Sequence, residues 1–299
     1  SAAIAAAEAG ARVVLLDEQA GAGGQIYRAI TSAEHPHAAR RLEVLGSDYA
    51  AGRPLAQALA ASSATHETGV AVWEVTRDRQ VHGLQHGRVR TWQAERVILA
   101  TGAMERPVPI PGWTLPGVMT AGAAQILLKA EQAVPRGPVV LAGCGPLLYL
   151  LGWQYLRAGV KISAVVDTTD FADYRRATAH AGAALRGWRV LAKGLKLLAT
   201  LRSAGVPFFS GASDLAVEGT EHAEALRFTA RGHTQRIAAD LVLLHQGVVP
   251  NTQISWSLRA EHRWDDAQLC WTPQTDAWGE LNVPGFFIAG DGGCISGAL

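Results

Sequence analysis

A short turn, Gly143-Cys144-Gly145-Pro146, is the clearest candidate for chemistry in this sequence. The apolar run "PVVLA" precedes it, the helix-like run "LLYLLGWQYL" follows it, and Asp167 comes 24 residues after Gly143. The first glycine of such a turn lets the chain reverse sharply, and the second lets a pyrophosphate approach the backbone. The helix that follows offers free N–H groups to the phosphates, and the acid is placed to accept hydrogen bonds from a ribose. The pattern therefore predicts a dinucleotide-binding fold.

Leu148 and the charged residues near Asp167 bear on which nucleotide this turn could bind. Leu148 stands where the third glycine of the G-x-G-x-x-G pattern is usual, so we expect the helix to lie further from the strand. The carboxylate of Asp167 would repel a 2′-phosphate, whereas Arg175 and Arg176 would attract one. The sequence favours NAD over NADP if either binds, and it leaves open whether a dinucleotide occupies this site.

An incomplete copy of the same pattern opens the chain. The stretch "SAAIAAAEAGARVVLLDE" indicates a helix, a stop at Gly10, a strand and an acid, in the order that surrounds Gly159 in the complete copy. Asp17 or Glu18 takes the place of the ribose-binding acid, and the spacing does not choose between them. The complete copy begins with a strand and a glycine loop, so we expect both in front of Ser1 and interpret the sequence as a fragment.

Five short apolar runs, at 12–16, 96–100, 138–142, 241–245 and 285–289, do not alternate polar and apolar residues. Such runs are typical of strands that are covered on both faces, as in parallel sheets. Each run is followed by small or acidic residues, and ligands of open α/β sheets bind beyond the carboxyl ends of the strands. The sequence predicts an α/β protein with two Rossmann-like, three-layer dinucleotide-binding domains.

The proline-rich segment 105–117 indicates the crossover between these domains, and the return lies near 252–265. We therefore expect the first domain at 1–112 and 256–299, with the second domain inserted at 113–255.

Five segments together carry a resemblance to a known family. They are "GGQIYR" (23–28), "ILATGAMERPVPIPGW" (98–113), "GCGP" (143–146), "HQGVVPN" (245–251) and "FFIAGDGG" (286–293). In combination they resemble the FAD-dependent flavoproteins with two dinucleotide-binding domains of the pyridine nucleotide-disulfide oxidoreductase superfamily. The stretch "RPVPIPGWTLPGVMTAGAAQ" with "QGVVPN" is similar to the A or alpha subunits of opine oxidases, hydrogen cyanide synthase and heteromeric proline, hydroxyproline or sarcosine dehydrogenases.

The resemblance implies an FAD site in the first domain. The acid, Asp17 or Glu18, would bind the adenosine ribose, and the strand 69–75 would contact adenine near Val72. Asp291 would accept hydrogen bonds from the ribityl chain. The backbone from Gly292 to Gly297 would direct N–H groups at the flavin edge where reduction builds negative charge. The other implied cofactor residues are Gly23, Gly24, Gln25, Ala100, Thr101, Gly102 and Gly290 for FAD, and Gly143, Gly145, Asp167 and Gly247 for the second nucleotide.

The cysteines depart from the disulfide reductases of this superfamily, which need a redox-active pair beside the flavin. Gln25 follows Gly24, no C-x-x-C occurs, and Cys144, Cys270 and Cys294 are far apart in sequence. We therefore expect no dithiol chemistry. The segment "HPH" (35–37) has no carboxylate or cysteine partner and is interpreted as a surface loop rather than a metal site. No catalytic side chain can be assigned from the sequence.

Composition excludes several other classes. The 299 residues carry a net charge of +1, so no strong field favours nucleic acid or an anionic membrane. A glycine-proline turn divides the apolar stretch 138–157, which therefore predicts a strand, a turn and a helix rather than a membrane span. With three unpaired cysteines and no visible signal peptide, a reducing cytoplasm is the expected compartment.

The leading hypothesis is an FAD-dependent oxidoreductase subunit that acts on an amine or amino acid (a CH–NH or CH–NH2 donor) with a second subunit. The resemblance also implies a cysteine-rich segment with a 2Fe–2S cluster beyond Leu299. One alternative is a free-standing NADH-dependent flavin reductase. Another is a non-catalytic subunit whose nucleotide folds are structural or regulatory.

Overall fold

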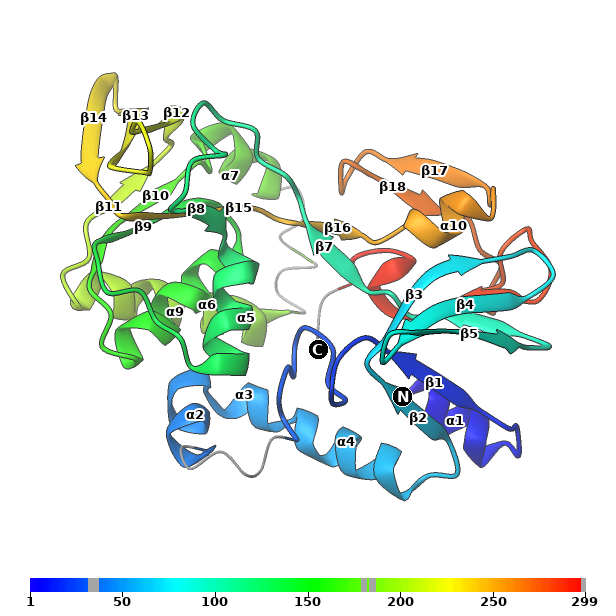
Figure 1. Cartoon of the computed structure of the whole chain (residues 1–299). Helices are drawn as coiled ribbons and strands as arrows, with labels where there is room; N and C mark the ends of the chain where they lie inside the picture. The colour runs from blue at the N-terminus through cyan, green and yellow to red at the C-terminus, as the bar shows by residue number, and fades with distance from the viewer. Residues whose placement is uncertain (32–37, 179–181, 183–186, 297–299) are drawn as a thin grey trace. The chain divides into compact units, whose positions relative to one another are not determined.

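The computed structural model describes residues 1–31, 38–178, 182 and 187–296. It contains two compact units, and most of their helices and strands are labelled in Figure 1. Unit 1 consists of Ser1–Ala38, Ser47–Met104 and Val248–Leu299. Unit 2 consists of Ala39–Gly46 and Glu105–Gly247, so one unit is inserted in the other, as the sequence predicts.

The boundaries of the units differ from the expected domain limits at 112/113 and 255/256. The chain enters unit 2 at Glu105 and leaves it at Gly247. The proline-rich segment belongs to unit 2 because Val108 and Ile110 pack against the core of that unit. Residues 39–46 also belong to unit 2, where the side-chain amide of Gln154 donates to the carbonyl of Leu45 at 3.2 Å.

Unit 2 is built on a five-stranded parallel sheet with the strand order β11-β10-β9-β15-β8. Its strands are β8 (Val118–Thr120), β9 (Val139–Cys144), β10 (Ile162–Asp167), β11 (Phe208–Ser210) and β15 (Leu241–Gln246). The helices of unit 2 are α2 (Ala38–Leu45), α5 (Ala121–Glu131), α6 (Pro146–Arg157), α7 (Phe171–Thr178) and α9 (Trp188–Ser203). Segment 138–157 thus forms a strand and a helix, and no helix in the described residues is long and apolar enough to cross a membrane.

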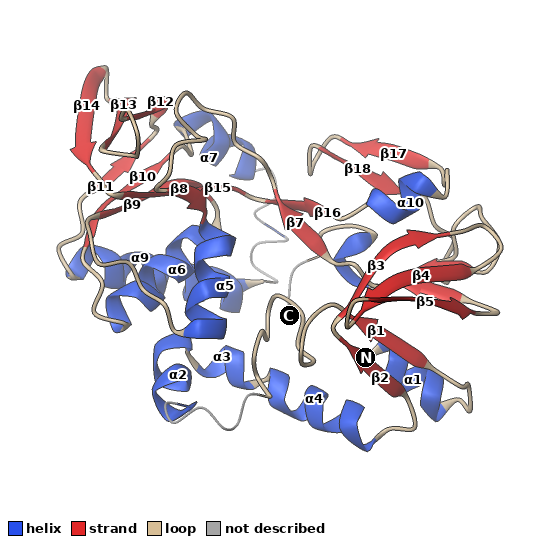
Figure 2. Cartoon of the chain, viewed as in Figure 1, coloured by secondary structure: helices blue, strands red, loops and turns tan. Residues whose placement is uncertain are grey.

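The parallel sheet of unit 2 is covered on both faces, which gives three layers (Figure 2). Helices α5, α6 and α9 lie on one face. A three-stranded antiparallel sheet covers the other and consists of β12 (Ser213–Glu218), β13 (Ala225–Ala230) and β14 (His233–Ala238). Val140 and Ala142 of β9 pack with Leu226 and Phe228 of β13, and all four are fully buried. The expectation of strands without polar alternation is confirmed here, because β9 is buried on both faces.

Unit 1 contains two parallel strand pairs. β1 (Val14–Asp17) pairs with β2 (Thr65–Thr68), and β19 (Phe286–Ile288) pairs with β6 (Val97–Leu99). Val14 and Ile98 are 45% and 44% exposed, so the expected covering on both faces is wrong for these two pairs. Each of these strands has a single neighbouring strand among the described residues. Helices α1 (Ala2–Glu8), α3 (Ser47–Ala50) and α4 (Gly52–Ala61) complete this part of the unit.

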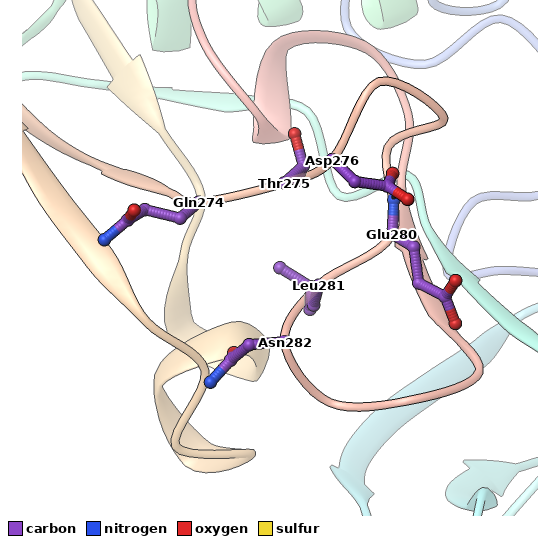
Figure 3. A pocket seen from close by; sticks show the side chains of 6 residues that line it. All are labelled: Gln274, Thr275, Asp276, Glu280, Leu281 and Asn282. Atoms are coloured by element: carbon purple, nitrogen blue, oxygen red, sulfur yellow. Dashed lines mark hydrogen bonds between the residues drawn. The ribbon is translucent and has the colours of Figure 1, made fainter.

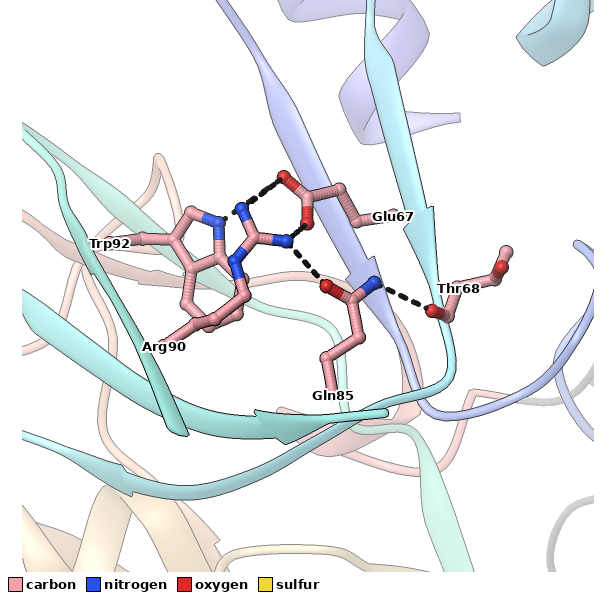
Figure 4. Close-up of polar contacts among 5 residues, drawn as sticks. All are labelled: Glu67, Thr68, Gln85, Arg90 and Trp92. Carbon is pink, nitrogen blue, oxygen red and sulfur yellow. Dashed lines mark hydrogen bonds and ion pairs between the residues drawn. The ribbon is translucent and has the colours of Figure 1, made fainter. Parts of the chain in front are cut away.

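A three-stranded antiparallel sheet of unit 1 follows β2 directly. It consists of β3 (Val70–Val75), β4 (Gln80–Gln85) and β5 (Arg88–Gln93), with β3 at its edge. Polar side chains tie it to β2 (Figure 4). The guanidinium of Arg90 bonds the carboxylate of Glu67 and the side chain of Gln85, whose amide donates to the carbonyl of Thr68 at 3.0 Å. These bonds fix the point at which the chain turns from β2 into β3.

The return segment of unit 1 carries the remaining short elements. The chain crosses between the units on the paired strands β7 (Ala103–Glu105) and β16 (Val248–Pro250). α10 (Gln253–Ser257) and the antiparallel pair β17 (His262–Asp265) and β18 (Cys270–Pro273) follow. A 3-10 turn, η1 (Gly290–Gly292), comes after β19.

Candidate functional site

The carboxyl ends of β6 and β19 bring two predicted cofactor segments of unit 1 together. The backbone N–H of Ala289 donates to the carbonyl of Leu99 at 3.0 Å. A Cβ placed on Gly292 would lie 3.4 Å from Oγ1 of Thr101, so the two loops are in close contact. Thr101 is exposed, and its hydroxyl donates to the carbonyl of Asn251 at 2.9 Å. Ala100, Thr101 and Gly102 therefore share one strand end with Gly290 and Asp291.

Asp291 is the only acid in η1, and its carboxylate makes no hydrogen bond or ion pair with any described residue. The residue is partly buried, and the next residue, Gly292, is buried. A partly buried carboxylate with unused acceptor sites at a strand end is suited to accept bonds from ligand hydroxyl groups. Gly297, also predicted to contact the cofactor, lies outside the described residues.

The two acids that follow β1 differ in their surroundings. Asp17 is the last residue of β1, and its Oδ1 accepts a 2.9 Å bond from the backbone N–H of Gln19. Its Oδ2 lies 3.5 Å from Nε2 of His66 on β2. Glu18 is exposed and has no hydrogen bond or ion pair with the described residues. Asp17 thus occupies the strand end from which a ribose is usually bound.

The turn at Gly23 and Gly24 is held by backbone packing. The carbonyl of Gly23 accepts a 2.9 Å bond from the N–H of Tyr27, and a Cβ at Gly23 would overlap the carbonyl oxygen of Tyr27. Around Gly24 there is open space, and Gln25 is exposed while its side chain accepts a 2.7 Å bond from Arg28. Val72 lies in the edge strand β3, where it pairs with Gly83 and packs partly buried against the core.

In unit 2 the predicted glycine turn joins β9 to α6 as expected. Gly143 has φ +131°, and a Cβ there would overlap the carbonyl oxygen of His245 on β15. Gly145 has φ +96°, but the nearest atoms to a Cβ there are 3.7 Å away. Leu148 is fully buried, and whether it holds the helix away from the strand stays a prediction. One turn later the helix lies close to β9 at Gly152, where a Cβ would lie 2.9 Å from the side chain of Leu141.

Asp167 ends β10 as predicted, but its carboxylate is already hydrogen-bonded. Its Oδ2 accepts the hydroxyl of Tyr149 at 2.6 Å, and its Oδ1 accepts the N–H of Thr169 at 2.8 Å. Asp167 is 1% exposed. The sequence analysis did not identify Tyr149 as a partner of Asp167. Its place in the first turn of the helix after the glycine loop is the signal that could have indicated this.

A second pair in unit 2 was also missed. Nδ1 of His245 lies 2.6 Å from Oε1 of Glu105, and Oε2 of Glu105 accepts a 2.7 Å bond from the N–H of Gly122 at the start of α5. His245 is 3% exposed. The ring also lies beside Gly145. The two residues are 140 positions apart, and no local pattern in the sequence announces such a pair. Gly247, after β15, has its carbonyl bonded by the N–H of Arg106 at 3.0 Å.

A shallow hollow of about 250 Å³ in unit 1 is lined by polar side chains around Leu281 (Figure 3). The polar groups are used within the turn. Oδ1 of Asp276 accepts the N–H groups of Trp278 and Glu280, and the Glu280 carboxylate accepts the N–H of Gly285. We assign no binding role to this hollow.

Comparison with known protein families identifies the family of this chain. The sequence model of the pyridine nucleotide-disulphide oxidoreductases matches residues 1–294. The chain belongs to this family. It is 44% identical over 306 residues to the A subunit of opine oxidase from Rhizobium meliloti, covering 100% of this chain and 57% of that protein. It is 30% identical over 314 residues to the HcnB subunit of hydrogen cyanide synthase from Pseudomonas aeruginosa, covering 99% and 64%. The chain spans about three fifths of the length of the curated relatives it matches.

Two solved structures share the fold of this chain. L-proline dehydrogenase from P. horikoshii matches with a TM-score of 0.65 and 15% identity over 97% of this chain and 48% of that one. Thioredoxin reductase from T. acidophilum matches with a TM-score of 0.61 and 18% identity over 97% and 85%.

The cysteines of this family member do not form a pair. All three lie in the described part of the chain and none forms a disulfide there; Cys270 is buried and Cys294 is exposed. Sγ of Cys294 lies 3.3 Å from the hydroxyl of Ser296. Cys144 donates to the side chain of Gln246 at 3.0 Å, and burial raises the pKa of its thiol. The chain therefore belongs to a family named for disulfide chemistry but has no disulfide among its described residues.

Proposed function

We propose that this chain is the FAD-binding part of an oxidoreductase subunit that takes electrons from an amine or amino acid within a larger complex. The observation that carries the proposal is the carboxylate of Asp291, which has no partner among the described residues. The next residue, Gly292, lies against the Thr101–Gly102 loop at the carboxyl ends of β6 and β19. Because the chain belongs to a family of oxidoreductases, we interpret this carboxylate as part of a redox cofactor site.

The residues of unit 1 fit FAD chemically. Asp291 offers acceptors to hydroxyl groups of a ribityl chain, and Asp17 offers its remaining acceptor positions to a ribose. We favour Asp17 over Glu18 because it ends β1, whereas Glu18 is exposed and past the strand. The open space around Gly24 allows a flat ring to approach the backbone closely.

The protein's own part in the reaction is binding and orientation. A bound flavin supplies the two-electron acceptor for the donor. Asp291 and the Thr101–Gly102 loop would hold it at the strand ends, and backbone N–H groups that follow η1 would favour negative charge there. No described cysteine pair takes part.

The donor class is inferred from the names of the relatives. Opine oxidase, sarcosine oxidase and L-proline dehydrogenase name donors that are all amino acids with a secondary amine. We therefore propose a donor of this type, with oxidation of a C–N bond. Because those sequence relatives are called subunits, we also propose that this chain works with a second subunit.

Purification of the full-length protein from its native source tests this function. We expect a flavin absorbance spectrum, a co-purifying second subunit, and bleaching of the flavin by an N-alkyl amino acid under anaerobic conditions. Iron and acid-labile sulfide in the same preparation test the expected 2Fe–2S cluster.

Other outcomes would favour other functions. Bleaching by NADH, with steady turnover of the isolated protein, would replace the proposal by a flavin reductase. A preparation without flavin that stays folded would favour a structural or regulatory nucleotide-binding subunit. A protein that elutes alone and oxidises the amine would contradict the proposed partner.

A further inference from the structure

Asp167, the acid of the glycine-loop fold in unit 2, is enclosed by its own chain. It is 1% exposed, although a ribose that binds in the usual way must reach this carboxylate with a hydroxyl group. The Tyr149 hydroxyl already donates to its Oδ2 at 2.6 Å, and the N–H of Thr169 donates to its Oδ1 at 2.8 Å. The hydrogen bond expected from a ribose is therefore supplied by the protein.

Tyr149 is held in this position from two sides. It lies in the first turn of α6, and its ring stacks on Phe208 of β11 with 6.1 Å between the ring centroids and 30° between the planes. Burial and the hydrogen bond to Asp167 raise the pKa of Tyr149, so its hydroxyl remains a donor throughout the neutral range. A hydroxyl that donates to a carboxylate forms one of the stronger kinds of hydrogen bond.

The neighbouring strand ends are also bonded to one another. Sγ of Cys144, the last residue of β9, donates to the side-chain oxygen of Gln246, and the amide of Gln246 donates to the hydroxyl of Thr168 at 3.0 Å. The N–H of Thr168 donates to the carbonyl of Gly143 at 2.9 Å. This chain of bonds links the ends of β9, β10 and β15, where a dinucleotide would cross the sheet.

We propose that Tyr149 is a specificity-determining residue that closes the nucleotide fold of unit 2 to NAD and NADH. A dinucleotide that uses the acid must first displace the phenol and then expose Asp167, and both steps weaken its binding. The nucleotide fold that contains Gly143, Gly145 and Asp167 therefore binds neither NAD nor NADH. Electrons that reach unit 1 come from a donor other than NADH.

The test is calorimetric titration of the full-length, flavin-loaded protein with NAD. Wild type gives no saturable binding up to about 1 mM. Tyr149→Ala removes the phenol and binds NAD with a Kd that is about tenfold or more below this limit. The double variant Tyr149→Ala with Asp167→Ala loses that gain because the ribose no longer has its acceptor.

Two controls keep the result interpretable. Tyr155→Phe changes a buried tyrosine of the same helix and leaves NAD binding as weak as in wild type. Circular dichroism and flavin content report whether each variant is folded, and Tyr149→Ser replaces Tyr149→Ala if the latter is not. Submillimolar binding of NAD by wild type overturns the proposal. A folded Tyr149→Ala or Tyr149→Ser variant that still does not bind NAD overturns it as well.

Discussion

The carboxylate of Glu105 joins His245, 2.6 Å away, to the first turn of α5, because its second oxygen accepts the N–H of Gly122. Glu105→Ala leaves both donors without an acceptor in a site where His245 is 3% exposed. We expect a loss of about 2–3 kcal/mol, which lowers the melting temperature in calorimetry by about 5–10 °C. Glu221→Ala, at an exposed acid of the same unit, is the control. An equal melting temperature for the two variants would show that the contact contributes little.

The two glycines of the turn in unit 2 should differ in their tolerance of alanine. Gly143→Ala overlaps the carbonyl of His245, whereas a Cβ at Gly145 has its nearest neighbours 3.7 Å away. Gly145→Ala therefore suffers mainly the cost of a positive φ, about 1–3 kcal/mol. We expect Gly143→Ala to lower the melting temperature clearly more than Gly145→Ala does. The reverse order would contradict the observed packing of the turn against β15.

Alkaline conditions should destabilise the protein through a buried tyrosine. Burial raises the pKa of Tyr155 to about 12, while an unfolded tyrosine titrates near about 10. Below the unfolded pKa both states hold the proton, so the stabilisation is complete. Above it only the unfolded state loses the proton, and stability falls by up to about 1.4 kcal/mol per pH unit until the folded group titrates.

Melting temperatures between about pH 8 and 11 measure this effect, and Tyr155→Phe should show a shallower decline. An identical decline in both proteins would mean that Tyr155 does not cause it. Tyr149, whose pKa is also raised, contributes in the same direction.

Thiol chemistry should be dispensable. Cys144, Cys270 and Cys294 form no disulfide with one another. We expect the full-length protein with serine at all three positions to bind FAD and to be reduced by its physiological donor at a similar rate. A folded, FAD-loaded triple variant that its donor cannot reduce would contradict a flavin site without a dithiol.

The sequence predicted the local parts of this fold well. The five apolar runs are strands, and the glycine turn, α6 and Asp167 follow in the expected order. These features depend on short stretches in which hydrophobic pattern and turn residues agree. The placement of residues 39–46 in unit 2 depends on the contact between Gln154 and Leu45, 109 positions apart.

The candidate sites show the same difference between local and distant contacts. Asp167 could be found from its spacing and Asp291 from the family resemblance, but their hydrogen-bond partners could not be predicted. Asp167 is enclosed by Tyr149, whereas Asp291 has no partner among the described residues. These opposite outcomes follow from side chains on other elements. The Glu105–His245 pair, 140 positions apart, has no local signature at all.

The affinity of the full-length apoprotein for FAD, followed by flavin fluorescence, tests the central claim most directly. Asp291→Ala removes a carboxylate that follows β19 and has no partner among the described residues. Losing a charged acceptor for ligand hydroxyl groups costs about 1.5–3 kcal/mol, so FAD should bind about ten- to a hundredfold more weakly. Asp266→Ala, at an exposed acid of the same unit, should bind FAD as wild type does. If Asp291→Ala is folded and binds FAD with the affinity of wild type, Asp291 does not hold the flavin and the proposed site is wrong.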